Sequence, residues 1–159
     1  MALAAGIDMA PCRLLDTRYP NGPFAGPTFT PGAVRTFNVP AGGCGVPNAA
    51  AYSVNFTLVN YVGTSGYITA FPAGGTPPGV STVNFGSGLP INNAAIVPTT
   101  NGSFEIYATG TTDVIADMNG ILRGKQLARG YLTTELEPAV ASVLASSPGA
   151  TVNVSGTKV

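Results

Sequence analysis

The stretch Ala51-Tyr52-Ser53-Val54-Asn55-Phe56-Thr57-Leu58-Val59-Asn60 carries the clearest structural pattern in the chain. Aromatic and aliphatic side chains occupy every second position from Tyr52 to Leu58, and small polar side chains lie between them. Side chains of a β-strand point alternately to its two faces, so this period of two predicts a strand with one buried face.

Similar short segments recur on both sides of this strand. Those with a strand-like pattern are residues 12–18, 33–39, 66–71, 80–85, 93–97, 103–108 and 113–121. Turns rich in Gly and Pro separate them, and no long amphipathic pattern comes before residue 122. Short, regularly spaced strands without helices between them are typical of an all-β, antiparallel β-sandwich of jelly-roll or immunoglobulin-like type.

The end of the chain has a different pattern. Thr134-Glu135-Leu136-Glu137 fits a capping box, and the apolar residues that follow recur at helical spacing up to Pro148. A last short strand is predicted over residues 151–155. We therefore expect three parts, which are an N-terminal arm (1–10), a β-sandwich domain (11–122) and a C-terminal extension (123–159) with a linker, a short helix and a terminal strand.

The composition excludes several classes of partner. Seven basic and seven acidic residues cancel, and charged residues make up 9% of the chain, where about 25% is usual. No net field attracts nucleic acid, and the basic cluster of Arg123, Lys125 and Arg129 is too small to bind it. Mean hydropathy is +0.29, yet no apolar run reaches the roughly 18 residues of a membrane span. The surplus apolar surface therefore indicates a core or contacts with other subunits.

The two cysteines, Cys12 and Cys44, lie at the ends of neighbouring extended segments. This arrangement favours one disulfide, and with it an extracellular or cell-surface location, the inside of a virion being an alternative. Two buried, reduced thiols are the competing interpretation. The chain has no histidine and no second cysteine pair, so we expect no zinc site and no cofactor.

A series of motifs runs through the predicted sandwich. They are PCRLLDTR (11–18), CGVPNAA (44–50), SVNFT (53–57), GYITAFPAG (66–74), STVNF (81–85) and DMNG (117–120). In this order they resemble a β-sandwich domain that recurs in secreted and cell-surface bacterial proteins, often attached to hydrolases or in tandem. The resemblance covers roughly residues 10–122 and implies a secreted, non-enzymatic module with a disulfide. The extension departs from the family pattern.

Five charged residues are candidates for a polar site. They are Arg13, Asp16, Arg18, Asp113 and Asp117, and we expect them to form a structural polar network. Asp16 and Arg18 share a strand face, which fits either an ion pair at the sandwich edge or part of a binding site.

Asp113 and Asp117, with Asn119 beyond, have the oxygen ligands of a calcium site or the acid and base of a glycosidase. Four residues along a strand span about 13 Å, which favours loop anchoring instead. Without histidine a Ser-His-Asp triad is excluded, and no motif surrounds Lys125 or Lys158, the candidates for a Ser-Lys pair. We therefore predict that the protein is not an enzyme.

The leading prediction for function is a structural subunit of an extracellular polymer, such as a filament, tube or sheath. Near-zero net charge and apolar ends favour association between copies, for example by strand addition at a sheet edge. The predicted contact residues are Leu3, Ile7, Met9, Leu136, Val140, Val143, Leu144, Val152 and Val154. The competing interpretation is that both ends fold back on their own domain.

The alternative function is a carbohydrate- or cell-wall-binding module. Sugars stack on exposed aromatic rings, and the chain has no tryptophan. The candidate rings are those of Tyr19, Tyr61, Tyr67, Tyr107 and Tyr131. A polysaccharide is therefore the second predicted class of partner.

Overall fold

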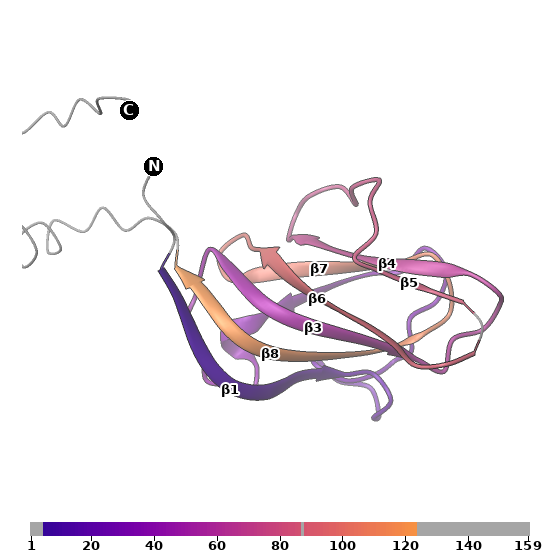
Figure 1. Cartoon of the computed structure of the whole chain (residues 1–159), viewed down its shortest axis with the longest axis horizontal. Helices are drawn as coiled ribbons and strands as arrows, with labels where there is room; N and C mark the ends of the chain where they lie inside the picture. Colours follow the sequence, from indigo (N-terminus) through magenta and orange to yellow (C-terminus); the bar gives the residue numbers. More distant parts are fainter. Residues whose placement is uncertain (1–4, 87, 124–159) are drawn as a thin grey trace, which may run out of the picture. The chain divides into compact units, whose positions relative to one another are not determined.

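The computed structural model describes residues 5–86 and 88–123 of the chain. In these residues eight strands and one short 3-10 helix, η1 (Val39–Ala41), follow one another (Figure 1). The strands are β1 (Ala5–Asp16), β2 (Val34–Asn38), β3 (Ala51–Val59), β4 (Gly66–Pro72), β5 (Val83–Phe85), β6 (Ile91–Pro98), β7 (Ser103–Ala108) and β8 (Asp113–Arg123). The helix and terminal strand predicted for the extension lie outside the described residues.

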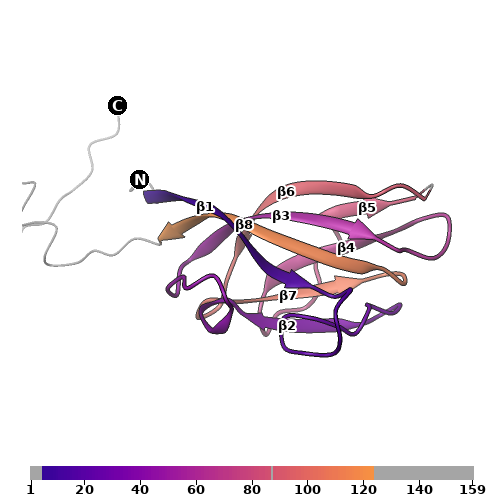
Figure 2. The same cartoon turned by 90° about the horizontal axis from the view of Figure 1, so that it is seen from below.

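The strands form two antiparallel four-stranded sheets that pack face to face. The first sheet has the order β1-β8-β3-β6 and the second the order β2-β7-β4-β5. β5 and β6 adjoin at one side of the two layers, and β1 and β2 lie at the other side (Figure 2). The predicted antiparallel β-sandwich is therefore confirmed.

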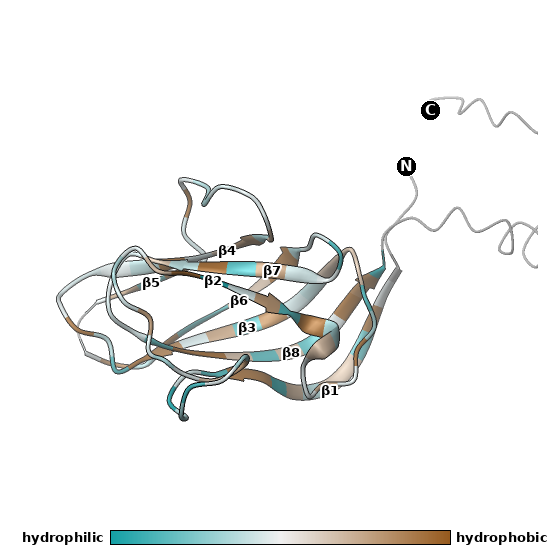
Figure 3. Ribbon diagram, turned by 180° about the vertical axis from the view of Figure 1, so that it is seen from behind, coloured by the Kyte–Doolittle hydropathy of each residue, from teal (hydrophilic) through white to brown (hydrophobic). Residues whose placement is uncertain are grey.

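The apolar face of β3 lies at the centre of the core. Its alternate side chains are fully buried, namely Tyr52, Val54, Phe56 and Leu58. Facing them, β7 buries Phe104, Ile106 and Ala108. Phe56 and Phe104 meet edge to face across the two sheets with ring centroids 6.2 Å apart, a favoured aromatic geometry. Hydrophobic segments accordingly recur along the strands of both sheets (Figure 3).

The first strand is longer than its sequence pattern predicts. β1 begins at Ala5 and pairs with β8 from the Ala5–Arg123 pair to the Asp16–Ile115 pair, with two register shifts. Residues 5–10 therefore belong to the sandwich and not to a separate arm. The described ends of β1 and β8 lie side by side (Figure 1), so the extension leaves the sandwich from a paired strand.

The fifth strand is shorter than predicted, because its regular pairing with β4 begins only at Val83. Only residues 83–85 of the predicted segment 80–85 form a strand, β5. Val80 exposes 67% of its surface, and its carbonyl oxygen accepts a hydrogen bond from the hydroxyl of Thr69 at 2.6 Å. β6, by contrast, extends beyond the predicted 93–97 to Ile91–Pro98.

Candidate functional site

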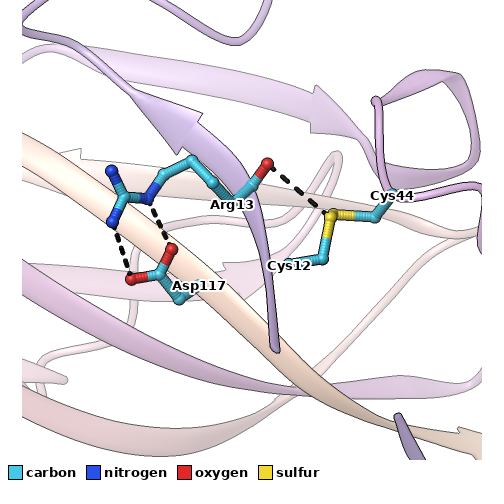
Figure 4. Close-up of a disulfide and its surroundings, with 4 residues drawn as sticks. All are labelled: Cys12, Arg13, Cys44 and Asp117. Carbon is cyan, nitrogen blue, oxygen red and sulfur yellow. Dashed lines mark hydrogen bonds and ion pairs between the residues drawn. A yellow bond between two sulfur atoms is a disulfide. The ribbon is translucent and has the colours of Figure 1, made fainter. Parts of the chain in front are cut away.

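The predicted disulfide between Cys12 and Cys44 is present. Cys12 lies on β1, and Cys44 lies in the loop after η1. Their sulfur atoms form a disulfide bond, and their Cα atoms are 5.8 Å apart (Figure 4). No free cysteine remains in the chain, so the interpretation as two reduced thiols is wrong. The bond fastens the outer strand of the first sheet to a loop 32 residues further along the chain.

Four of the five predicted polar residues form a continuous chain of ion pairs. Arg13 pairs with Asp117 on the neighbouring strand β8, Nε to Oδ1, at 2.5 Å, and with Asp16 at 3.0 Å. Asp16 also accepts two hydrogen bonds from the guanidinium of Arg18, at 2.7 and 2.9 Å. The order Asp117–Arg13–Asp16–Arg18 therefore ties β8, β1 and the start of the following loop together.

The pKa values of two of its members show how strongly this series of ion pairs is bound together. Hydrogen bonds from the Arg18 side chain hold the pKa of Asp16 below its usual value, against the opposing effect of burial. The hydrogen bond to Asp117 likewise raises the pKa of Arg13. Asp16, with only 4% of its side chain exposed, is thus an ionised and fully engaged carboxylate at neutral pH. Such a group has no proton to donate at neutral pH, and its oxygens are engaged by Arg13 and Arg18.

Asp113 does not belong to this series of ion pairs, and its hydrogen-bond partners are uncharged. Its buried carboxylate accepts hydrogen bonds from the hydroxyls of Thr17 and Thr28 at 2.9 and 2.7 Å, and from the amide of Asn60 at 2.9 Å. These donors come from the turn after β1 and from two other loops, so Asp113 anchors three segments. Asp113 and Asp117 therefore serve separate clusters. In residues 5–86 and 88–123 no group of three or more acidic, Cys or His side chains could hold a metal.

A further structural side chain, Arg35 on β2, is one that sequence reasoning missed. Its guanidinium carbon lies 5.1 Å from the ring centroid of Phe29 and 5.2 Å from that of Phe37. The same group donates hydrogen bonds to the carbonyl oxygens of Ala25 and Pro27 at 2.7 and 2.8 Å. Burial lowers the pKa of Arg35. One signal was available, because Arg35 and Phe37 are two residues apart and so share a strand face.

The tyrosines differ in how much of their rings they offer to a ligand. Tyr61 stacks on Phe85 with ring centroids 5.0 Å apart, so that ring is engaged inside the molecule. Tyr67 on β4 and Tyr107 on β7 are half-buried and lie together, with centroids 6.5 Å apart and planes at 63°. They alternate with core residues of their strands and therefore stand on the outer face of the second sheet. Tyr19 is exposed in a loop.

The described surface includes two shallow hollows. One, of about 500 Å³, is lined by residues 71–76 and by Pro78 and Thr100. The other, of about 380 Å³, is lined by parts of β1, β3, β6 and β8 and includes Asp8 and Ile96. The second hollow has one carboxylate, that of Asp8, and one hydroxyl, that of Ser53, among its lining residues, and the first has no carboxylate.

The predicted subunit contacts fall mostly beyond the described part. Ile7 exposes 40% of its surface, whereas Met9 is partly buried and packs against its own core. Leu3, Leu136, Val140, Val143, Leu144, Val152 and Val154 lie outside the described residues, as does Tyr131.

Charge is distributed unequally between the two sides of the sandwich. The sequence from Thr36 to Phe104 contains no Asp, Glu, Lys, Arg or His. This segment includes β3, β4, β5 and β6, which fill the side of the sandwich that ends in β5 and β6 (Figure 2). We call the edge formed by β5 and β6 the uncharged edge, and that formed by β1 and β2 the charged edge.

Comparison of the chain with family models, curated proteins and solved structures finds no match. Among the described residues, no helix is long and apolar enough to cross a membrane.

Proposed function

We propose that this protein is a non-enzymatic structural subunit of an extracellular, self-assembling polymer such as a filament, tube or sheath. In this proposal the C-terminal extension makes contacts between copies. The observation that carries it is the apolar surface of a domain with few charged residues. Large aliphatic side chains with 38% to 73% of their surface exposed are Ile7, Val34, Val62, Val80, Leu89, Ile91 and Ile96.

The way the extension leaves the domain supports a contact role. Arg123, the last described residue, is still paired with Ala5 in the first sheet, so the extension starts from a fixed point. Its sequence predicts a short helix with an apolar stripe, and such a helix needs a surface to pack on. Near-zero net charge removes the repulsion that keeps copies apart.

The disulfide supports the proposed location. Disulfides persist in oxidising surroundings and are rare in the cytosol. The bond between Cys12 and Cys44 and the motif resemblance to secreted bacterial sandwiches both favour an extracellular or cell-surface protein.

Truncation tests the proposal. A chain stopped after Lys125 keeps all eight strands and their core, and we expect it to lose the polymer that the full chain forms. Electron microscopy and sedimentation velocity of both chains under oxidising conditions are the measurements. If the full chain is a monodisperse monomer, the proposal fails, and if the truncated chain polymerises equally well, the role of the extension fails.

A second candidate function is a carbohydrate- or cell-wall-binding module, favoured by the paired rings of Tyr67 and Tyr107 on the outer sheet face. Retention of a monomer on insoluble polysaccharide would support it, provided that Tyr67→Ala and Tyr107→Ala abolish the retention. Tyr19→Ala, at an exposed loop position, is the matched control.

A further inference from the structure

β6 has no hydrogen-bonded strand neighbour on one side of its backbone among the described residues. It is the last strand of the first sheet and pairs with β3 from Leu58–Ile91 to Ala51–Pro98 without a register shift. Ile91 and Ile96 expose 38% and 55% of their surfaces. A long, regular and exposed edge strand is a template on which another strand can pair.

The other three edge strands are protected in ways that β6 is not. β1 has two register shifts, contains Pro11 and is covered near Cys12 by the disulfide. β2 and β5 have only five and three residues, and short strands offer little edge to a partner. Pro90 and Pro98 bound β6 at its ends and leave its middle accessible.

The charge of the edge indicates what kind of partner fits. β6 lies within the segment 36–104, which has no charged residue, so the edge offers nothing to a charged partner. A second copy of the same edge would bring no like charges together. The partner that fits best is therefore equally uncharged, and this edge meets that requirement itself.

The size of the edge is compatible with a weak dimer. The eight residues of β6 make the edge about 27 Å long. The two sheets lie roughly 10 Å apart, and with their side chains the edge is about 20 Å wide. The pair would bury about 1,000 Å² in total, near the lower end for specific interfaces. Such a contact gains strength in an assembly, because contacts through the extension raise the local concentration of copies.

We propose that β6 pairs antiparallel with β6 of a second copy across a two-fold axis. The two first sheets then continue into one another, with the outer-face side chains Asn92, Ala94 and Ile96 of each copy beside those of the other. This inference rests on the proposed self-assembly and adds to it a symmetric contact that is separate from the extension. Polymers of the full chain are then built from pairs of subunits.

Charge insertion in the full, oxidised chain tests the inference. Ile96→Lys and Ala94→Lys each place a lysine on exposed surface of β6 and, by symmetry, two lysines at the interface. We expect the dissociation constant of the dimer to rise about 100-fold, since like charges in an interface are strongly unfavourable. Val34→Lys is the matched control, because Val34 is an exposed aliphatic residue (46%) on the opposite edge strand, β2. Sedimentation equilibrium gives the constants, and hydrogen exchange of residues 91–98 shows whether their backbone is paired.

The outcomes separate this inference from the proposed function. The inference is overturned if both β6 variants dimerise with the wild-type dissociation constant. It is also overturned if Val34→Lys raises that constant as much as the β6 variants do. Loss of β6 protection when residues 126–159 are removed overturns it too, because the partner strand is then the extension (residues 151–155). A chain truncated after Lys125 that still dimerises through β6 but does not polymerise supports both proposals. A truncated chain that still polymerises overturns the role of the extension alone, and a monomeric full chain overturns both.

Discussion

The charged edge carries the disulfide, the ion pairs and Arg35, whereas the uncharged edge has no charged side chain and no disulfide. On the charged edge, β1 is bonded through Cys12 to a distant loop and through Arg13 to Asp117 of β8. On the uncharged edge, Asn93 donates a side-chain hydrogen bond to the carbonyl oxygen of Thr82 at 2.9 Å. An edge strand can thus be fixed by bonds within its own domain, as on the charged edge. It can also remain accessible to a partner strand, as we propose for the uncharged edge.

The largest expected effect on the charged edge comes from removing its covalent bond. The double variant Cys12→Ser, Cys44→Ser opens a loop of 32 residues and should lower the free energy of unfolding by about 3–4 kcal/mol. Chemical denaturation with and without reductant measures the loss. Reductant should destabilise the wild type by a similar amount and leave the double variant unchanged. A loss below about 1 kcal/mol would show that the ion pairs close this edge without the disulfide.

The next effect should come from Arg35, which holds the loop that precedes β2. Arg35→Met removes the donor to the carbonyl oxygens of Ala25 and Pro27 and the cation between Phe29 and Phe37. We expect a loss of about 2–3 kcal/mol, since the two carbonyls lose their donor and the two rings lose their cation. The control Arg35→Lys keeps the charge but not the planar fork, and should recover less than half of the loss. Equal stability of Lys and Arg would mean that only the charge matters.

The sequence was sufficient for elements with a strong local pattern and insufficient where long-range partners decide the structure. Alternation within residues 51–60 and 103–108 predicted the buried faces of β3 and β7 correctly. Residues 5–10 show no such pattern, and they form a strand because β8 continues to Arg123 and offers them a partner. The burial of Arg35 depends on Phe29 in a preceding loop, which a pattern within β2 does not contain.

The polar residues illustrate the same limit. Shared strand faces suggested one network of five residues, and four of them are indeed connected by ion pairs. Asp113 instead binds Thr17, which is 96 residues away in the sequence, and Asn60, which is 53 residues away. Neither donor carries a charge or a motif that points to Asp113, so only the folded structure could reveal that cluster.

A smaller, pH-dependent effect should follow from Asp16. Its pKa is lower in the folded chain than the ordinary value of 3.8, so its ionised form stabilises the fold above about that pH. This stabilisation is lost as the pH falls through the folded pKa. Asp16→Asn should cost about 1 kcal/mol at neutral pH, because both arginine partners are partly solvated.

Thermal melts between pH 7 and pH 2 measure this effect. The difference between Asp16→Asn and the wild type should shrink as the solution becomes acidic. Asp8→Asn, at an exposed position of the same strand, is the matched control and should follow the wild type. If the difference stays constant across this range, Asp16 stabilises the edge by its shape and not by its charge.

The smallest expected effect is on the uncharged edge. It measures how much the side-chain hydrogen bond of this edge contributes to the free energy of unfolding. Asn93→Ala removes the hydrogen bond to Thr82, and because Asn93 is exposed, the loss in unfolding free energy should be only about 0.5 kcal/mol. Hydrogen exchange of residues 80–85 should nevertheless become faster, since that bond links β6 to the segment before β5. Asn92→Ala, at the exposed neighbouring position, should change neither quantity. A loss above about 2 kcal/mol would contradict the comparison, because the edge would then be closed by its own bonds and poorly suited to a partner.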